Sequence, residues 1–94
     1  MKLDVIDHQP HAWFLLRDGD DHYLDVNCSH GPVGFSLLVK LSAAEHEEYR
    51  ALGRVFIDYL AARVAYWWSD YKERDLGSSL QAEVSDAVTR FRSR

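Results

Sequence analysis

The sequence predicts a single α+β domain, residues 1–94, in which an antiparallel β-sheet is followed by helices. Short alternating apolar runs, separated by Gly, Pro and Asp, fill the first part of the chain, and the apolar period changes to that of a helix after Ser42. Strands that precede helices in this way are typical of an α+β fold with the helices on one face of the sheet. We expect a three-stranded meander, or a four-stranded one if residues 3–6 join it, then a long helix and a C-terminal helix (β-β-β-α-α).

The first clear element is a β-hairpin formed by residues 11–17 and 22–28. Both runs are rich in apolar and aromatic residues, and the second alternates between apolar and polar side chains. Between them stands a cluster of aspartates around Gly19, which permits the positive φ that a tight turn needs. Residues 3–6 are a candidate for a fourth, edge strand, and Pro10 separates them from the hairpin.

The length of the hairpin loop decides which side chains face each other. A two-residue loop at residues 19–20 sets Trp13 opposite Val26 and His11 opposite Cys28. Moving the loop back by one residue keeps the same faces but pairs His11 with Val26. In the first register His11 and Cys28 meet at one end of the hairpin.

A third strand is expected at residues 35–41, after a loop that contains Gly31 and Pro32. Because side chains of a strand point alternately to opposite faces, the meander has one strongly apolar face, which we expect to contact the helices. Its second face also carries bulky apolar side chains beside polar ones. These apolar residues are Phe14, Leu16, Tyr23 and Leu38.

A long helix is expected to begin after Ser42, because Ser42 and Glu45 form a capping box. One helix over residues 43–76 would be about 50 Å long, whereas a seven-residue strand spans only about 23 Å. We therefore expect one of two outcomes. Either the helix breaks, at Ser69 or less favourably at Gly53, or its far end projects beyond the sheet and needs another partner.

A final helix is expected near Gly77, which we interpret as the C-terminal stop of the preceding helix. Ser78 and Gln81 form a second capping box, so the final helix is expected to begin there. Its apolar stripe consists of Leu80, Val84, Ala87, Val88 and Phe91.

Aromatic residues are concentrated in the second half of the long helix. A line of side chains that includes Phe56 and Trp67 is expected to face the sheet, but toward the C-terminal end the apolar arc widens to roughly 200°. Because neighbouring residues on a helix point about 100° apart, Trp67 and Trp68 cannot both face one core. Arg63 lies at the edge of the apolar stripe, where we expect it to stack on an aromatic ring and extend toward solvent.

These surfaces predict more apolar area than one copy of the chain can cover. Either the C-terminal helix covers the second face of the sheet, or a second copy of the chain covers it through a twofold interface. We expect the second copy. The sequence thus favours a small non-enzymatic binding or assembly module that forms a homodimer. The expected interaction surface consists of Phe14, Leu16, Tyr23, Leu38, Tyr59, Arg63, Tyr66, Trp67 and Trp68.

Charge and composition narrow the class of partner. The net charge is −4, and residues 1–48 carry nine acidic and three basic residues, so most of the surface would repel a phosphate backbone. We expect no nucleic-acid partner and no membrane span, and the single cysteine favours a reducing, cytoplasmic location. The acidic first half leaves open a second class, an inhibitor or immunity-type protein that binds a basic partner.

His11, Cys28 and His30 most resemble a chemical site, because the hairpin brings them toward one end. A Cys and two His can ligate Zn²⁺, but Cys-x-His lacks the usual ligand spacing. As a nucleophile Cys28 needs a lowered pKa, whereas a place on the apolar face raises it. We expect a buried thiol, no metal and no cofactor. A small metal-dependent or thiol enzyme, assisted by Asp25, stays the alternative.

Asp25 and Asn27 share the second sheet face with Tyr23 and form a small polar set. Such a set within an apolar rim is one way to build a ligand site. The simpler interpretation, which we favour, is ordinary polarity that faces solvent.

Overall fold

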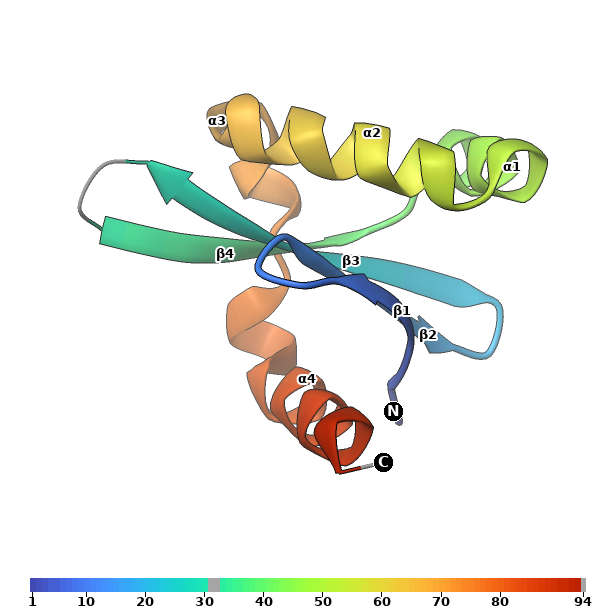
Figure 1. Ribbon diagram of the computed structural model, residues 1–94, viewed down its shortest axis with the longest axis vertical. Helices are drawn as coiled ribbons and strands as arrows, with labels where there is room; N and C mark the ends of the chain where they lie inside the picture. The colour runs from blue at the N-terminus through green and yellow to red at the C-terminus, as the bar shows by residue number, and fades with distance from the viewer. Residues whose placement is uncertain (31–32, 94) are drawn as a thin grey trace.

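The structure is a computed structural model that describes residues 1–30 and 33–93, except for the side chains of Ser29, His30 and Val33. Strands come first and helices follow (Figure 1), which confirms the predicted α+β class. The elements are β1 (Asp4–Gln9), β2 (Trp13–Asp18), β3 (Asp21–His30), β4 (Val33–Lys40), α1 (Ala43–Leu52), α2 (Arg54–Tyr66), α3 (Trp68–Tyr71), the 3₁₀ turn η1 (Lys72–Arg74) and α4 (Gly77–Arg92).

The strands form one antiparallel sheet in the order β1-β2-β3-β4, so the N-terminal segment joins the meander as an edge strand. In the β2–β3 hairpin Trp13 pairs with Val26, as predicted for a two-residue loop. The prediction that His11 stands opposite Cys28 is wrong, because the ladder between these strands ends at Trp13. His11 lies instead in the turn between β1 and β2, with a positive φ of 66°.

A β-bulge in β1 changes the face that its side chains meet. The register shifts between Val5 and Asp7, so Ile6 is the extra residue. Val5 is buried against α4, whereas Asp7 points to the opposite face and accepts a hydrogen bond from Arg54 of α2. The next side chain, that of His8, returns to the side of α4. Without the extra residue Val5 and Asp7 would share a face.

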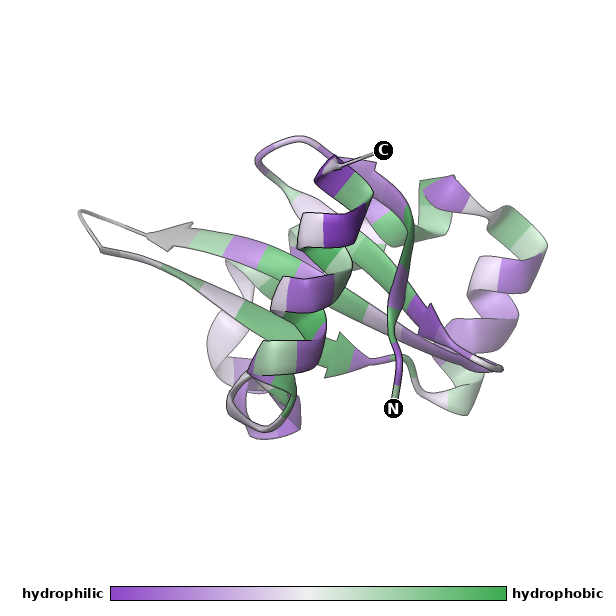
Figure 2. Ribbon diagram, turned by 90° about the horizontal axis from the view of Figure 1, so that it is seen from below, coloured by the Kyte–Doolittle hydropathy of each residue, from purple (hydrophilic) through white to green (hydrophobic). Residues whose placement is uncertain are grey.

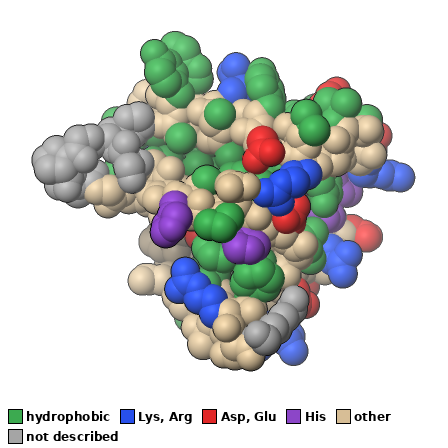
Figure 3. Space-filling view, in the orientation of Figure 1, with side chains coloured by type: hydrophobic (Ala, Val, Ile, Leu, Met, Phe, Trp, Pro, Cys, Tyr) green, Lys and Arg blue, Asp and Glu red, His purple; other side chains and the backbone are tan. Residues whose placement is uncertain are grey.

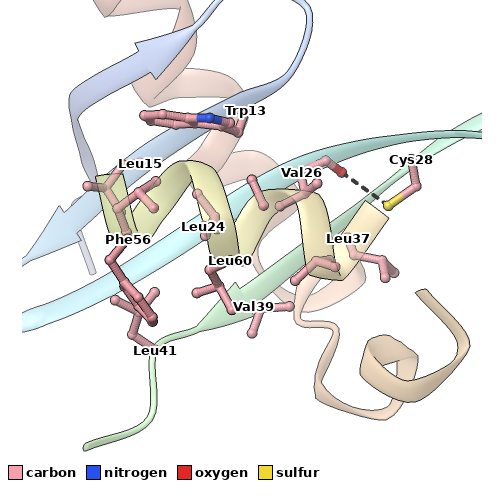
Figure 4. Close-up of a cluster of buried hydrophobic side chains, with 13 residues drawn as sticks. Trp13, Leu15, Leu24, Val26, Cys28, Leu37, Val39, Leu41, Phe56 and Leu60 are labelled. Atoms are coloured by element: carbon pink, nitrogen blue, oxygen red, sulfur yellow. Dashed lines mark hydrogen bonds between the residues drawn. The ribbon is translucent and has the colours of Figure 1, made fainter. Parts of the chain in front are cut away.

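Helices cover both faces of the sheet. Figure 1 shows α1, α2 and α3 on one side and α4 on the other, so the prediction of helices on a single face is wrong. The core between the sheet and α2 is continuous (Figure 4). Its buried members are Trp13, Leu15, Leu24, Val26, Cys28, Leu37, Val39, Leu41, Phe56, Ile57, Leu60, Ala61 and Val64.

A second core lies between the sheet and α4. The predicted stripe of α4 provides its helical side, and Figure 2 shows apolar and polar positions in alternate bands along this helix. The buried members of the second core are Leu3, Val5, Leu16, Tyr23, Leu38 and Ala87, with Phe14, Leu76, Leu80, Val84, Val88 and Phe91 packed around them.

The long predicted helix breaks twice. α1 ends at Gly53, whose φ of 66° and ψ of −143° suit glycine alone, and α2 ends at Trp67, whose φ of −106° and ψ of 41° are not helical. The breaks therefore flank α2, and Ser69 lies inside α3. The second break resets the helical phase, so that Trp67 faces solvent and Trp68 packs against the core, the reverse of the predicted stripe.

The two predicted capping boxes have different outcomes. The Ser42 box is confirmed, since the Ser42 hydroxyl accepts from the Glu45 N–H and the Glu45 carboxylate accepts from the Ser42 N–H. The box at Ser78 is wrong. α4 already begins at Gly77, which is therefore a first helical residue rather than a helix stop, and no side chain caps it in the predicted way.

Asp75 fixes the point at which the chain passes from one face of the sheet to the other. Its carboxylate accepts hydrogen bonds from the backbone N–H groups of Leu38 and Gly77, each at 2.9 Å. The Leu76 N–H donates to the Leu38 carbonyl at 2.8 Å, and Asp75 forms an isolated bridge with Val39. One side chain thus ties the start of α4 to the edge of β4.

Replacing Gly53 by Ala is expected to lower the free energy of unfolding by about 1–3 kcal/mol, because a side chain strains this backbone conformation. Space is not the cause, since a Cβ at Gly53 would meet no atom within 4 Å. Gly53→Asn should be equally harmful, because its ψ lies outside the left-handed region that Asn tolerates. Urea unfolding measures the change. Glu48→Ala, at an exposed helical position of α1, is the control and should be nearly neutral.

Candidate functional site

The apolar sheet face predicted as a docking surface is covered within the chain. Leu16, Tyr23 and Leu38 are at most 3% exposed, and Phe14 is half-buried with its ring edge-on to that of Phe91. The prediction that this face awaits a second copy is wrong, because α4 reaches it.

The apolar side chains that do remain exposed gather on the outer side of α2. Tyr59 and Tyr66, both expected at the interaction surface, are exposed, and Val55, which the sequence analysis did not single out, is 72% exposed. Figure 3 shows hydrophobic side chains standing out from the helices on this side. We call Val55, Tyr59, Ala62 and Tyr66 the α2 outer stripe, and Leu52 and Trp67 lie near its two ends, also exposed.

Arg63 and Trp68, the other two helical members of the predicted surface, have partners in the chain. The Arg63 guanidinium lies over the Tyr59 ring at 5.8 Å and donates to the Tyr71 hydroxyl at 3.4 Å, so the expected stacking is present. Trp68 is half-buried and makes an edge contact with Phe35 at 5.3 Å. Of the two neighbouring tryptophans, only Trp67 is left largely in solvent.

A groove opens on the opposite side of the sheet, between α4 and the β3–β4 hairpin. It consists of two adjoining pockets of about 520 and 380 Å³, which share Asp25 and Ser36 as lining residues. These volumes lie in or near the range of small-molecule sites, about 300–1,000 Å³. Figure 3 shows histidine and hydrophobic side chains gathered in this region, with basic side chains beside them. We call it the Asp25 groove.

Asp25 lies at the wall common to both pockets and is half-buried rather than freely solvated as expected. Burial, and then the nearby Asp75 carboxylate, raise the pKa of Asp25 to about 6. Within residues 1–30 and 33–93, no hydrogen bond or ion pair reaches its carboxylate. Tyr23, the third member of the predicted polar set, is buried under α4 and does not line the groove.

The first pocket has an aromatic wall built from β1, β2 and α4. The His8 ring stacks on Phe14 at 5.8 Å and meets Phe91 edge-on at 4.8 Å. The Arg92 guanidinium lies over the Phe14 ring at 5.8 Å. The β1 bulge places His8 in this wall, because the extra residue turns its side chain toward α4. The pocket thus combines aromatic surface with the Asp25 carboxyl.

The cysteine and histidine cluster proposed from the sequence does not form a site in the described part of the chain. Cys28 is fully buried on the α2 side, where its Sγ donates to the Val26 carbonyl at 3.6 Å (Figure 4), and burial raises the pKa of the thiol. The His11 side chain is exposed in the β1–β2 turn. The His30 side chain lies outside the described residues. Among those described, no three His, Cys, Asp or Glu residues are close enough to hold a metal ion.

Sequence reasoning missed His8, Asp75 and Arg92 as groove residues. For His8 the cause is the bulge, which no alternation of apolar and polar residues predicts. Asp75 carried a usable signal, since an Asp two residues before a Gly is typical of a side-chain-capped turn. Arg92 lies in the last helical turn and reaches the groove only because α4 covers the second sheet face.

Comparisons with known protein families, curated proteins and solved structures found no match to this chain. In the part of the chain that the structure describes, no helix has both the length and the apolar character needed to cross a lipid bilayer. Two surfaces of the described chain are left as candidates for function, the α2 outer stripe and the Asp25 groove.

Asp25→Asn is expected to stabilise the fold above the pKa of Asp25. Because the folded-state pKa is about 6 and thus above its unfolded value, the folded state binds more protons between these two values, and stability falls as pH rises through them. Two pKa units correspond to roughly 2–3 kcal/mol. Urea unfolding of both proteins across the acidic and neutral range tests this. The difference in free energy of unfolding between Asp25→Asn and the parent should become small near pH 4. A variant less stable than the parent at neutral pH would contradict the prediction.

The Cys28 thiol is expected to react slowly with a chromogenic disulfide reagent, since it is fully buried. The rate should rise with urea in parallel with unfolding, because exposure of the thiol limits the reaction. Fast labelling of the folded protein at mildly acidic pH would show an accessible thiolate and revive the thiol-enzyme alternative.

Proposed function

We propose that this protein is a small binding and assembly module that forms a homodimer through the α2 outer stripe. One observation carries the proposal, namely that α2 is apolar on both sides. Its inner side packs on the sheet through residues that include Phe56, Leu60 and Val64, and its outer side exposes the stripe. A helix that carries apolar stripes on two sides normally has both of them covered.

The spacing of the stripe suits a second helix of the same kind. Val55, Tyr59, Ala62 and Tyr66 follow one another at intervals of four, three and four residues, which is the spacing of the seam between paired helices. In an antiparallel pair with a twofold axis between residues 60 and 61, Tyr59 of one copy faces Ala62 of the other, and Val55 faces Tyr66. Large side chains then meet smaller ones, as close packing requires.

The charged residues beside the stripe favour a second copy over a partner of opposite charge. Arg54 is already paired with Asp7, and Asp58 accepts a hydrogen bond from the Trp13 indole at 3.0 Å. These two charged side chains are therefore not available to pair with charges on a partner protein. The α2 surface therefore gives little support to the alternative of an acidic inhibitor that binds a basic protein.

The size of α2 sets the strength of the dimer. With 13 residues, the helix is about 20 Å long. A pair of such helices buries less than the roughly 1,200–2,000 Å² of a stable interface, even with help from Leu52 and Trp67 at the ends. We therefore expect a dimer that forms at high micromolar concentration and dissociates on dilution.

Sedimentation at high micromolar concentration should give a mass near twice the 10.9 kDa of one chain, falling toward 10.9 kDa on dilution. Tyr59→Glu should give a monomer at all these concentrations, because it places two carboxylates in the centre of the seam. Tyr59 is exposed, so the variant should keep the circular dichroism and urea midpoint of the parent.

Ala82→Glu is the matched control, because Ala82 is also an exposed apolar residue of a helix but lies on α4, on the other side of the sheet from α2 (Figure 1). It should associate like the parent protein. A single-chain mass for the parent at high micromolar concentration, or equal dissociation of the two variants, would overturn the proposal.

A further inference from the structure

We propose that the Asp25 groove binds a small organic ammonium ion with an aromatic or apolar body, and that the Asp25 carboxylate is its counter-ion. The groove lies on the opposite side of the sheet from the α2 outer stripe. The inference is therefore independent of the dimer, and either can fail alone.

The position of Asp25 favours a cation as the ligand. Its carboxylate lines both pockets, and among the described residues it has no hydrogen-bond or ion-pair partner. The second carboxylate in the groove, that of Asp75, is held in place by the backbone N–H groups of Leu38 and Gly77. A positively charged donor between two carboxylates relieves their repulsion and satisfies Asp25 at the same time.

The remaining polar lining of the second pocket suits an N–H donor. Ser36, Ser78, Ser85 and Gln81 line it together with the two aspartates. Hydroxyl and amide oxygens accept hydrogen bonds from the three N–H groups of a primary ammonium. A bare metal ion would need a tighter set of ligands, and no such set is present among the described residues.

The first pocket provides a place for the body of the ligand. Phe14, Phe91 and His8 form its aromatic wall, next to Asp25. The Phe14 ring already carries the Arg92 guanidinium at 5.8 Å, so the chain itself supplies a cation there. The charge of the ligand therefore belongs beside Asp25, and its apolar part belongs beside the rings.

The energetics of Asp25 support a functional role. An unpartnered, half-buried carboxylate disfavours the folded state, and its raised pKa of about 6 records that penalty. Residues that lower the stability of the fold and make no stabilising contact in it are typical of binding sites. A bound ammonium ion would supply the missing partner.

The proposal is tested with 2-phenylethylamine as the probe, by NMR titration of the whole protein at neutral pH, where Asp25 is mostly ionised. Backbone resonances of residues that line the groove should shift with the amine. The isosteric alcohol, 2-phenylethanol, should bind at least about tenfold more weakly, since it has the same ring without the charge. Phenylacetate should not bind.

Asp25→Asn should weaken amine binding at least about tenfold while keeping the fold, since it replaces the carboxylate with a neutral group of the same shape. Asp70→Asn is the matched control, because it removes the same charge from an exposed position on α3, across the sheet from the groove. It should bind like the parent. Absence of shifts at several millimolar amine, equal binding of the alcohol, or equal loss in both variants would overturn the proposal.

Discussion

The sheet is apolar on both faces, and the fold depends on covering both with one short chain. The chain does this by crossing the open edge of β4 between η1 and α4. At the crossing, Asp75 bridges Val39, its carboxylate accepts from the Leu38 N–H, and the Leu76 N–H donates to the Leu38 carbonyl. Without this crossing, α4 would not cover the second core. Each large apolar side chain left exposed there would lower the free energy of unfolding by roughly 1.5–3 kcal/mol.

The same crossing links the fold to the groove. The Asp75 carboxylate holds the start of α4 and is thereby fixed beside Asp25, where it adds to the rise in the Asp25 pKa. In the described residues no lysine or arginine pairs with Asp25 to offset this repulsion. A carboxylate that holds the backbone thus raises the electrostatic cost of ionising its neighbour Asp25, and the ammonium ion proposed for the groove would offset that cost.

Local patterns predicted the elements, but tertiary contacts decided how they meet. The Ser42 box could be predicted because its two partners lie three residues apart, whereas the same pattern at Ser78 fails because Asp75, held by β4, supplies the acceptor first. Periodicity assigned the faces of β2 and β3 correctly and could not say which element covers the second face. Trp67 was misplaced because a break of one residue resets the helical phase. The groove depends on that unpredicted covering and on the β1 bulge.

The position of the groove follows from the length and alternation of β3. With ten residues this strand is about 33 Å long, and α4 crosses it rather than following it, since the helix starts beside Leu38 of β4 and ends beside Leu3 and Asp4 at β1. Along the face that meets α4, Tyr23 is buried and Asp25 and Asn27 follow, and a carboxylate resists burial under a helix far more than a tyrosine does. The cover therefore stops at Asp25. Alternate residues of the strand point to the other face, where Leu24 and Val26 belong to the core under α2. The same strand therefore lines a closed core on one face and an open groove on the other.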